Sequence, residues 1–144
     1  MEFSNSIMIE RPPQEVFAYL AAFENVPRWN HAITETRKTS PGPVGVGATY
    51  RQTRSTPSPA SETFSVTRFE PDHDLAIEGT IGPFEGTLSY HLEPAGDSTV
   101  LTNDAHLKGT GVAALAAPIA SGRIRAAVAH NLEVLKTTLE DRSG

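Results

Sequence analysis

Few residues in this sequence have side chains suited to acid, base or hydrogen-bond chemistry at apolar positions. Glu62 and Tyr90 lie in segments that alternate apolar and polar residues, and His31 follows the single tryptophan, Trp29. A carboxyl group or an imidazole can act as a general acid or base, and a tyrosine hydroxyl can donate a hydrogen bond. No spacing assembles a nucleophile, a base and an orienting group, so the sequence assigns no catalytic residue, and Glu62, Tyr90 and His31 remain weak candidates.

The other histidines are less suited to a site. His91 and His106 fall on the polar side of their alternating segments, His73 lies in a predicted turn, and His130 lies beside the apolar stripe of the last helix. No pair of His, Asp or Glu residues has a recognised metal-ligand spacing, and the acidic turn around His73 is typical of a solvated loop. We therefore expect no metal and no cofactor.

The composition indicates one ordinary globular domain over residues 1–144. The formal net charge is -5 and no run of Lys and Arg occurs, which argues against a nucleic-acid surface. The N-terminal residues lack a basic segment followed by an apolar one, and no run approaches eighteen apolar residues. We expect neither a signal peptide nor stable membrane insertion, and we take the cytoplasm as the default location.

A long amphipathic helix from Val112 to Glu140 is the element on which the other elements should pack. Its apolar residues recur at three or four positions, which places them on one face. They are Ile124, Val128, Leu132, Leu135 and Leu139, with Leu115 and Ile119 extending the stripe upstream. Pro118 and Gly122 interrupt the pattern, so we expect the helix to start or bend at Pro118.

The first half of this helix is rich in alanine. Small residues facing a sheet leave volume unfilled, and empty volume is destabilising, so the pattern indicates a possible pocket. Two other interpretations stay open at this point. Large aromatic residues from the sheet could fill the space, or the alanines could face water and serve only as good helix formers.

Between the first strand and this helix the pattern is of short helices and then a run of strands. Pro- and Gly-rich turns separate the strands at roughly ten-residue spacing, which is typical of an antiparallel sheet. We expect strands over Phe3 to Glu10, Ala32 to Thr39, Ala48 to Ser55, Ser61 to Phe69, Leu75 to Ile81, Phe84 to Glu93 and Thr99 to Leu107, and short helices over Gln14 to Leu20 and Glu24 to Trp29. This order predicts an α+β fold with a curved antiparallel sheet.

Alternation along the strands identifies the face that should be buried. The apolar members bring a few polar residues to the same face, and Arg54 shares the side of Gln52. The polar residues predicted on the inner face are Tyr50, Gln52, Glu62, Tyr90 and Asn103. Polar groups converging in an apolar concavity are typical of a small-molecule site, although a satisfied internal network is the alternative, above all for Glu62.

Five segments of this sequence resemble the polyketide cyclase/dehydrase and lipid-transport superfamily, the START-related SRPBCC proteins. The segments are Ile9-Glu10-Arg11-Pro12-Pro13-Gln14-Glu15-Val16-Phe17-Ala18-Tyr19-Leu20, Val26-Pro27-Arg28-Trp29, Val44-Gly45-Val46-Gly47-Ala48, Val66-Thr67-Arg68-Phe69-Glu70-Pro71 and Leu135-Lys136-Thr137-Thr138-Leu139-Glu140. The resemblance implies a helix-grip fold, in which a bent seven-stranded antiparallel sheet wraps round a long C-terminal helix and two short helices close one end. It also implies a deep cavity for hydrophobic ligands between sheet and helix.

Our first hypothesis is a protein, monomeric or homodimeric, that encloses a hydrophobic or amphipathic small molecule. The residues predicted to contact it are Trp29, Tyr50, Gln52, Glu62, Phe64, Phe84, Leu88, Tyr90, Asn103, Ile124 and Val128. The loops at residues 42–47 and 57–59 are predicted to form a mobile mouth. The alternatives are a polyketide cyclase or dehydratase acting through Glu62, Tyr90 or His31, and a partner-binding protein whose cavity is filled by its own side chains.

Overall fold

The computed structural model describes residues 1–109 and 112–142, without the side chains at positions 112–114 and 116–120. Seven strands, two α-helices and a 3-10 turn precede a long terminal helix. In chain order they are β1 (Glu2–Ile9), α1 (Pro13–Ala21), η1 (Phe23–Asn25), α2 (Val26–Trp29), β2 (Ile33–Lys38), β3 (Thr49–Arg54), β4 (Ala60–Glu70), β5 (Asp74–Ile81), β6 (Phe84–Ala95), β7 (Ser98–Gly109) and α3 (Val112–Asp141). The predicted α+β class and the predicted order of elements are confirmed.

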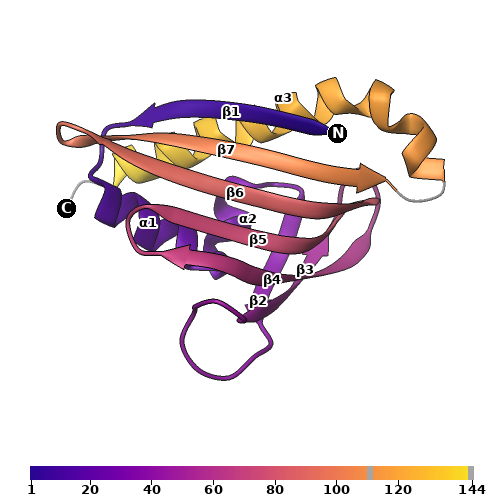
Figure 1. Cartoon of the computed structure of the whole chain (residues 1–144), viewed down its shortest axis with the longest axis horizontal. Helices are drawn as coiled ribbons and strands as arrows, with labels where there is room; N and C mark the ends of the chain where they lie inside the picture. Colours follow the sequence, from indigo (N-terminus) through magenta and orange to yellow (C-terminus); the bar gives the residue numbers. More distant parts are fainter. Residues whose placement is uncertain (110–111, 143–144) are drawn as a thin grey trace.

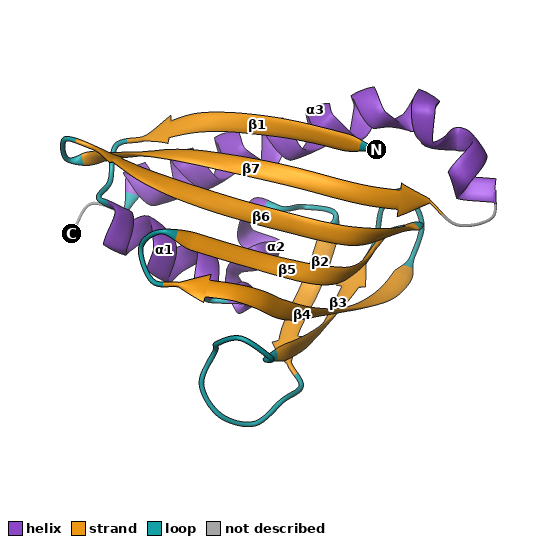
Figure 2. Ribbon diagram, in the orientation of Figure 1, coloured by secondary structure: helices purple, strands orange, loops and turns teal. Residues whose placement is uncertain are grey.

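The strands form one antiparallel sheet in the order β1-β7-β6-β5-β4-β3-β2. All three α-helices lie on one side of this bent sheet, with α3 running along β1 and β7 (Figure 1). The long loop between β2 and β3 projects away from the sheet (Figure 2). This is the helix-grip arrangement that the resemblance implied.

Two glycines permit the sharp bend of the sheet. Gly79 of β5 and Gly86 of β6 are directly paired, and both fall on the inner face. A Cβ atom at Gly79 would lie 2.2 Å from the carbonyl oxygen of Thr63, and one at Gly86 would lie 1.9 Å from that of His106. Because no side chain fits at either position, neighbouring strands can approach closely there and the sheet can curl round the helix.

The alternation predicted for the strands is confirmed. On β7 every second residue from Thr99 to Leu107 is buried, while His106 is exposed. Tyr50, Gln52, Glu62, Tyr90 and Asn103 are all buried on the inner face, as predicted. The second predicted short helix is divided, since a 3-10 turn over residues 23–25 precedes α2.

The terminal helix differs between its two halves. Leu132, Leu135 and Leu139 are at most 1% exposed, whereas Ile124 and Val128 are half-buried. The C-terminal half is also held to the end of β1, because Lys136 Nζ donates to the carbonyl oxygen of Met8 at 2.8 Å. The second half of α3 therefore belongs to the main core, and the first half has a different environment.

The predicted start of α3 is wrong in two respects. The helix begins at Val112, so the alternative of a start at Pro118 is wrong, whereas a change of direction in the first part of its ribbon agrees with the alternative of a bend (Figure 1). Leu115 is 82% exposed and does not extend the buried stripe, because the first turns of α3 run past the ends of β1 and β7. The predicted burial of Ile119 concerns a side chain outside the described residues. Within the described ranges no helix is both long and apolar enough to cross a membrane.

Candidate functional site

A cavity of about 670 Å³ lies between the inner face of the sheet, the middle of α3 and the short helices. Every layer of the fold contributes to its wall. The lining residues are Phe3, Leu20, Phe23, Val26, Trp29, Asn30, His31, Ala32, Gln52, Arg54, Thr56, Pro57, Phe64, Ile77, Ile81, Gly82, Pro83, Phe84, Leu88, Tyr90, Asn103, Leu107, Arg123, Ile124, Ala127, Val128 and Asn131. Its volume lies within the range of pockets that enclose small organic molecules.

The helical side of the cavity is one face of α3. Arg123, Ala127 and Asn131 follow one another at four-residue spacing, so they lie in one row along the helix. The small side chain of Ala127 at the middle of this row leaves room that a larger residue would fill. Of the alanines in this helix that could line the predicted pocket, Ala127 lines the cavity and Ala126 and Ala129 do not. The side chains of the alanines at 113–114, 116–117 and 120 lie outside the described residues.

An aromatic cluster supports the part of the cavity wall that Phe23 and Phe64 form. The ring of Phe23 makes edge contacts with Tyr50 and Phe64 at centroid distances of 4.9 and 5.3 Å, and Tyr50 stacks on Phe64 at 5.1 Å. Offset and edge contacts of this kind fix ring orientations. Phe23 and Phe64 can therefore present rigid apolar surface to the cavity while Tyr50 supports them from the core.

A buried carboxylate network lies at one edge of the cavity. Glu62 is 1% exposed and accepts hydrogen bonds from Gln52 Nε2 at 2.8 Å and from the backbone N–H of Gly82 at 2.6 Å. Arg54 donates from Nε to Oε2 at 2.6 Å and from an Nη to Oε1 at 3.2 Å. This two-point contact fixes the guanidinium plane against the wall. The strand pairing places the network, because Gln52 is opposite Glu62.

Three polar groups on buried residues of the cavity wall lack a hydrogen-bond partner among the described residues. Trp29 Nε1 and Asn103 Oδ1 are fully buried and unpaired, although Asn103 donates from Nδ2 to the carbonyl oxygen of Ser89 at 3.3 Å. The hydroxyl of Tyr90 also makes no hydrogen bond there, and burial raises the pKa of Tyr90 to about 12. At neutral pH the Tyr90 hydroxyl is therefore protonated and can donate a hydrogen bond.

Most residues that the sequence predicted as ligand contacts are brought together in this cavity. Those that line it are Trp29, Gln52, Phe64, Phe84, Leu88, Tyr90, Asn103, Ile124 and Val128. Tyr50 and Glu62 do not line it, because Tyr50 packs in the aromatic cluster and Glu62 is enclosed by its hydrogen-bond donors. His31 is exposed at the wall. Contact of any of these residues with a ligand stays a prediction.

Sequence reasoning gave no role to several lining residues. Phe23, Val26 and Leu20 come from the short helices, whose inward faces could be predicted but whose position over the sheet could not. Arg54 was placed on the inner side of its strand, yet its pairing with Glu62 was not foreseen. The sequence feature that could have indicated this ion pair is an arginine and a glutamate at inward positions of adjacent strands.

The mouth of the cavity corresponds only in part to the prediction. Thr56 and Pro57, Gly82 and Pro83, and residues 30–32 line the cavity from three separate turns. No residue of the loop at 42–47 lines it, and Val44 of that loop instead packs against the core. Motion at any of these segments stays a prediction.

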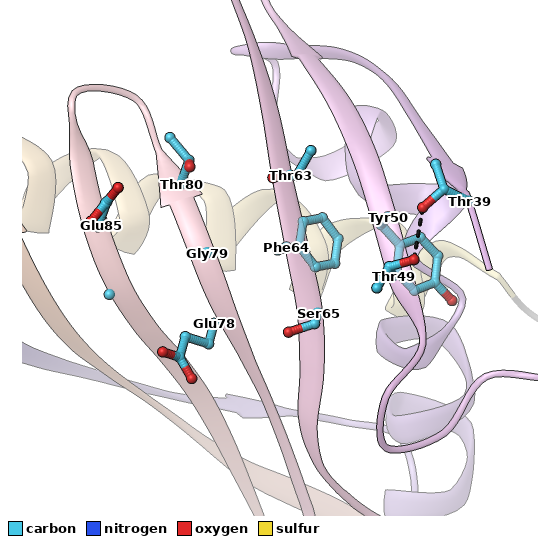
Figure 3. A pocket seen from close by; sticks show the side chains of 11 residues that line it. Thr39, Thr49, Tyr50, Thr63, Phe64, Ser65, Glu78, Gly79, Thr80 and Glu85 are labelled. Atoms are coloured by element: carbon cyan, nitrogen blue, oxygen red, sulfur yellow. Dashed lines mark hydrogen bonds between the residues drawn. The ribbon is translucent and has the colours of Figure 1, made fainter.

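A second hollow of about 410 Å³ lies among β3, β4, β5 and β6, with Thr39 at its edge (Figure 3). Its wall includes exposed hydroxyl and carboxylate groups such as Thr63, Glu78 and Glu85. Thr39 and Thr49 share a hydrogen bond of 2.8 Å between their hydroxyls. We regard the inner cavity as the candidate site, because it combines apolar walls with unpaired buried polar groups. No three His, Cys, Asp or Glu side chains gather as a metal site within the described part of the chain.

Comparison with known proteins gives a family and a set of similar folds. The model of the family described as polyketide cyclase / dehydrase and lipid transport matches residues 1–140. No curated protein matches the sequence. Solved structures that resemble this one differ widely in sequence, so they show the fold alone.

Three of these structures are similar over almost the whole chain. The protein TTHA0849 from Thermus thermophilus is 12% identical, with 100% of both chains covered and a TM-score of 0.79. The Zhui aromatase/cyclase from Streptomyces sp. R1128 is 12% identical, covering 99% of this chain and 94% of its own, with a TM-score of 0.79. A START superfamily protein from Mycobacterium smegmatis is 16% identical, covers 99% of each chain and has a TM-score of 0.77.

Proposed function

The chain belongs to the polyketide cyclase/dehydrase and lipid-transport family, and we propose that it binds a hydrophobic or amphipathic small molecule between the sheet and α3. The observation that carries the proposal is the cavity of about 670 Å³, whose wall is mostly apolar and encloses unpaired polar atoms. A ligand would bury its apolar body there and place its polar end against the few polar groups. The predicted cytoplasmic location and the state of monomer or homodimer stay predictions.

The cavity wall accounts for how such a ligand would be held. Phe64, Phe84, Leu88, Ile124 and Val128 supply apolar surface from both sides of the cavity. Removing a ligand's apolar surface from water is worth about 25 cal/mol per Å² before the cost of association is subtracted. Since these residues sit on strands and a helix, the apolar shape is present before any ligand enters.

Filling the cavity tests this proposal directly. Ala126 and Ala127 are both exposed, but only Ala127 lines the cavity. Ala127→Trp should therefore place an indole at the cavity wall, whereas Ala126→Trp adds the same group outside it. Binding of a fluorescent fatty-acid probe should fall at least about tenfold in Ala127→Trp and stay unchanged in Ala126→Trp. Absence of probe binding to the natural protein, or equal binding to both variants, would refute the proposal.

An enzymatic role finds less support in the arrangement of the predicted candidates. The carboxylate of Glu62 is engaged by donors on both oxygens and does not line the cavity. Tyr90 can donate a proton or hydrogen bond, but its raised pKa makes it a poor base at neutral pH. We therefore propose binding without covalent chemistry. Turnover of a polyketide-like ketone that is lost in Tyr90→Phe, with folding intact, would favour the enzyme instead.

A further inference from the structure

The charge of the cavity wall is opposite to the charge of the chain. The chain carries 17 acidic and 12 basic residues, yet the lining includes Arg54, Arg123 and His31 and contains no Asp or Glu. The carboxylate of Glu62, which pairs with Arg54, also accepts bonds from two other donors and does not line the cavity. The lining therefore has two arginine side chains and no carboxylate.

We propose that the ligand of this cavity is an amphiphile whose polar end carries a negative charge, bound by Arg54 and Arg123. The inference rests on the proposed function and adds the chemical class of the ligand. A neutral polar end can accept a hydrogen bond from a guanidinium but lacks the charge that strengthens it, and a cationic end is repelled by both arginines.

Arg54 supplies the first part of the argument. A guanidinium has five N–H donors, and hydrogen bonds to Glu62 use two of them, one on Nε and one on an Nη. The other three have no acceptor among the described residues. Only 13% of the Arg54 side chain is exposed and Arg54 lines the cavity, so these donors can be reached by water or a ligand in the cavity. The planar group is also fixed by its contact with Glu62, which prepares it for an anionic partner.

Among the remaining polar atoms of the wall, the Tyr90 hydroxyl can also donate a hydrogen bond to a ligand. Trp29 Nε1–H and Asn103 Oδ1 are an unpaired donor and an unpaired acceptor with equally negligible accessible surface, so together they favour neither sign of charge. The preference for a negative charge therefore depends on the two arginines.

Arg123 supplies the second cation, from the opposite side of the cavity. It lies one helical turn before Ala127 in the row that lines the cavity, and it makes no ion pair with any described residue. Its side chain is exposed, so its charge is screened by salt more strongly than that of Arg54. Arg125, two residues later, is also exposed but does not line the cavity, and it provides a matched control.

Three twelve-carbon amphiphiles test the inference: dodecanoate, dodecanol and dodecyltrimethylammonium. Each would displace a neutral fluorescent probe from the folded protein, below the concentration at which it forms micelles. Dodecanoate should bind at least about tenfold tighter than dodecanol, the effect of one hydrogen bond to a charged group, and the cation should bind most weakly. The difference in affinity between dodecanoate and dodecanol should decrease as the salt concentration rises.

Variants assign this preference to the two arginines. Arg123→Gln should reduce the preference for dodecanoate over dodecanol by about two- to fivefold, and Arg125→Gln should leave it unchanged. Arg54→Lys keeps the charge but loses the guanidinium fork, and it should remove most of the preference without weakening dodecanol binding. If Arg54→Lys fails to fold, the pair of variants on α3 still decides the outcome.

The failure of this inference can be distinguished from failure of the proposed function. Equal displacement by all three amphiphiles would overturn the preference for a negative charge and leave binding of hydrophobic molecules intact. An equal loss of preference in Arg123→Gln and Arg125→Gln would also overturn it, since a general surface charge would then be responsible. If no compound and no probe binds, the proposed function itself fails.

Discussion

Replacing Glu62 by alanine should lower the free energy of unfolding by about 3–5 kcal/mol. The carboxylate is 1% exposed and accepts four hydrogen bonds from three residues, Gln52, Arg54 and Gly82. Alanine would leave the Arg54 charge, in a side chain only 13% exposed, without its counterion. It would also leave the amide of Gln52, which is 8% exposed, without an acceptor.

The magnitude follows from these separate losses. An unpaired buried neutral donor costs about 1–3 kcal/mol, and a charged one costs more. Part of this cost is recovered because the cavity beside Arg54 can admit water to the guanidinium. The sum agrees with the range found when one partner of a buried ion pair is removed.

Urea unfolding at neutral pH, followed by circular dichroism, measures this free energy. Glu70→Ala is the matched control, because Glu70 pairs with Arg68 on the same strand while both side chains are more than half exposed. It should cost less than about 1 kcal/mol. The double variant Arg54→Met with Glu62→Leu should be more stable than Glu62→Ala, since it leaves no unpaired charge. A cost for Glu62→Ala as small as that for Glu70→Ala would refute the reasoning.

Three further predictions concern the core, the bend of the sheet and the outer face. Leu135→Ala should cost about 2–5 kcal/mol because Leu135 is fully buried, whereas Ile124→Ala should cost about 1 kcal/mol or less because Ile124 already borders the cavity. Gly86→Ala should destabilise the protein by at least about 1–3 kcal/mol, since its Cβ would strike the next strand. Hydrogen bonds to Asp74 and a second carboxylate raise the pKa of His91. The stability that His91 adds is therefore fully present below its unfolded pKa of about 6.5 and is lost as pH rises through the higher folded value. His91→Gln should lower the urea midpoint more at pH 5.5 than at pH 8.5.

Each of these has an outcome that would contradict it. Equal losses for the two variants of α3 would show that both halves of the helix are packed alike. Gly45→Ala is the control for the bend, since nothing lies within 4 Å of its Cβ position, and a loss in that variant equal to that in Gly86→Ala would contradict the steric argument. For His91, a difference that grows with pH would show that the charged form is not the stabilising one.

The inner face of the sheet could be predicted from sequence because side chains alternate along a strand. Burial of Tyr90 and Asn103 followed from the apolar residues on either side of each of them. The apolar stripe of α3 was predicted for Leu132 to Leu139 by the same kind of periodicity. The prediction of burial failed at Leu115. Periodicity shows which residues share a face of the helix, but it does not show where the sheet that covers this face ends.

The polar side of the candidate site could be predicted only in part. Arg54 and Glu62 were placed on the inner face, but their pairing depends on the register of β3 against β4, in which Gln52 is opposite Glu62. Register is set by the turn between the strands and by the packing of the whole sheet, neither of which the alternation of one strand determines. Likewise the exposed positions of α3 did not show that Arg123 lines the cavity while Arg125 does not.

The sequence by itself determined the elements, their order and the sides on which they are apolar, because these depend on repeats of two and of 3.6 residues within short segments. Only the tertiary structure decided that a hollow remains between α3 and the sheet. That hollow depends on how sharply the strands bend at Gly79 and Gly86 and on where α3 lies across them. Both result from packing between residues far apart in the chain, which no local pattern records.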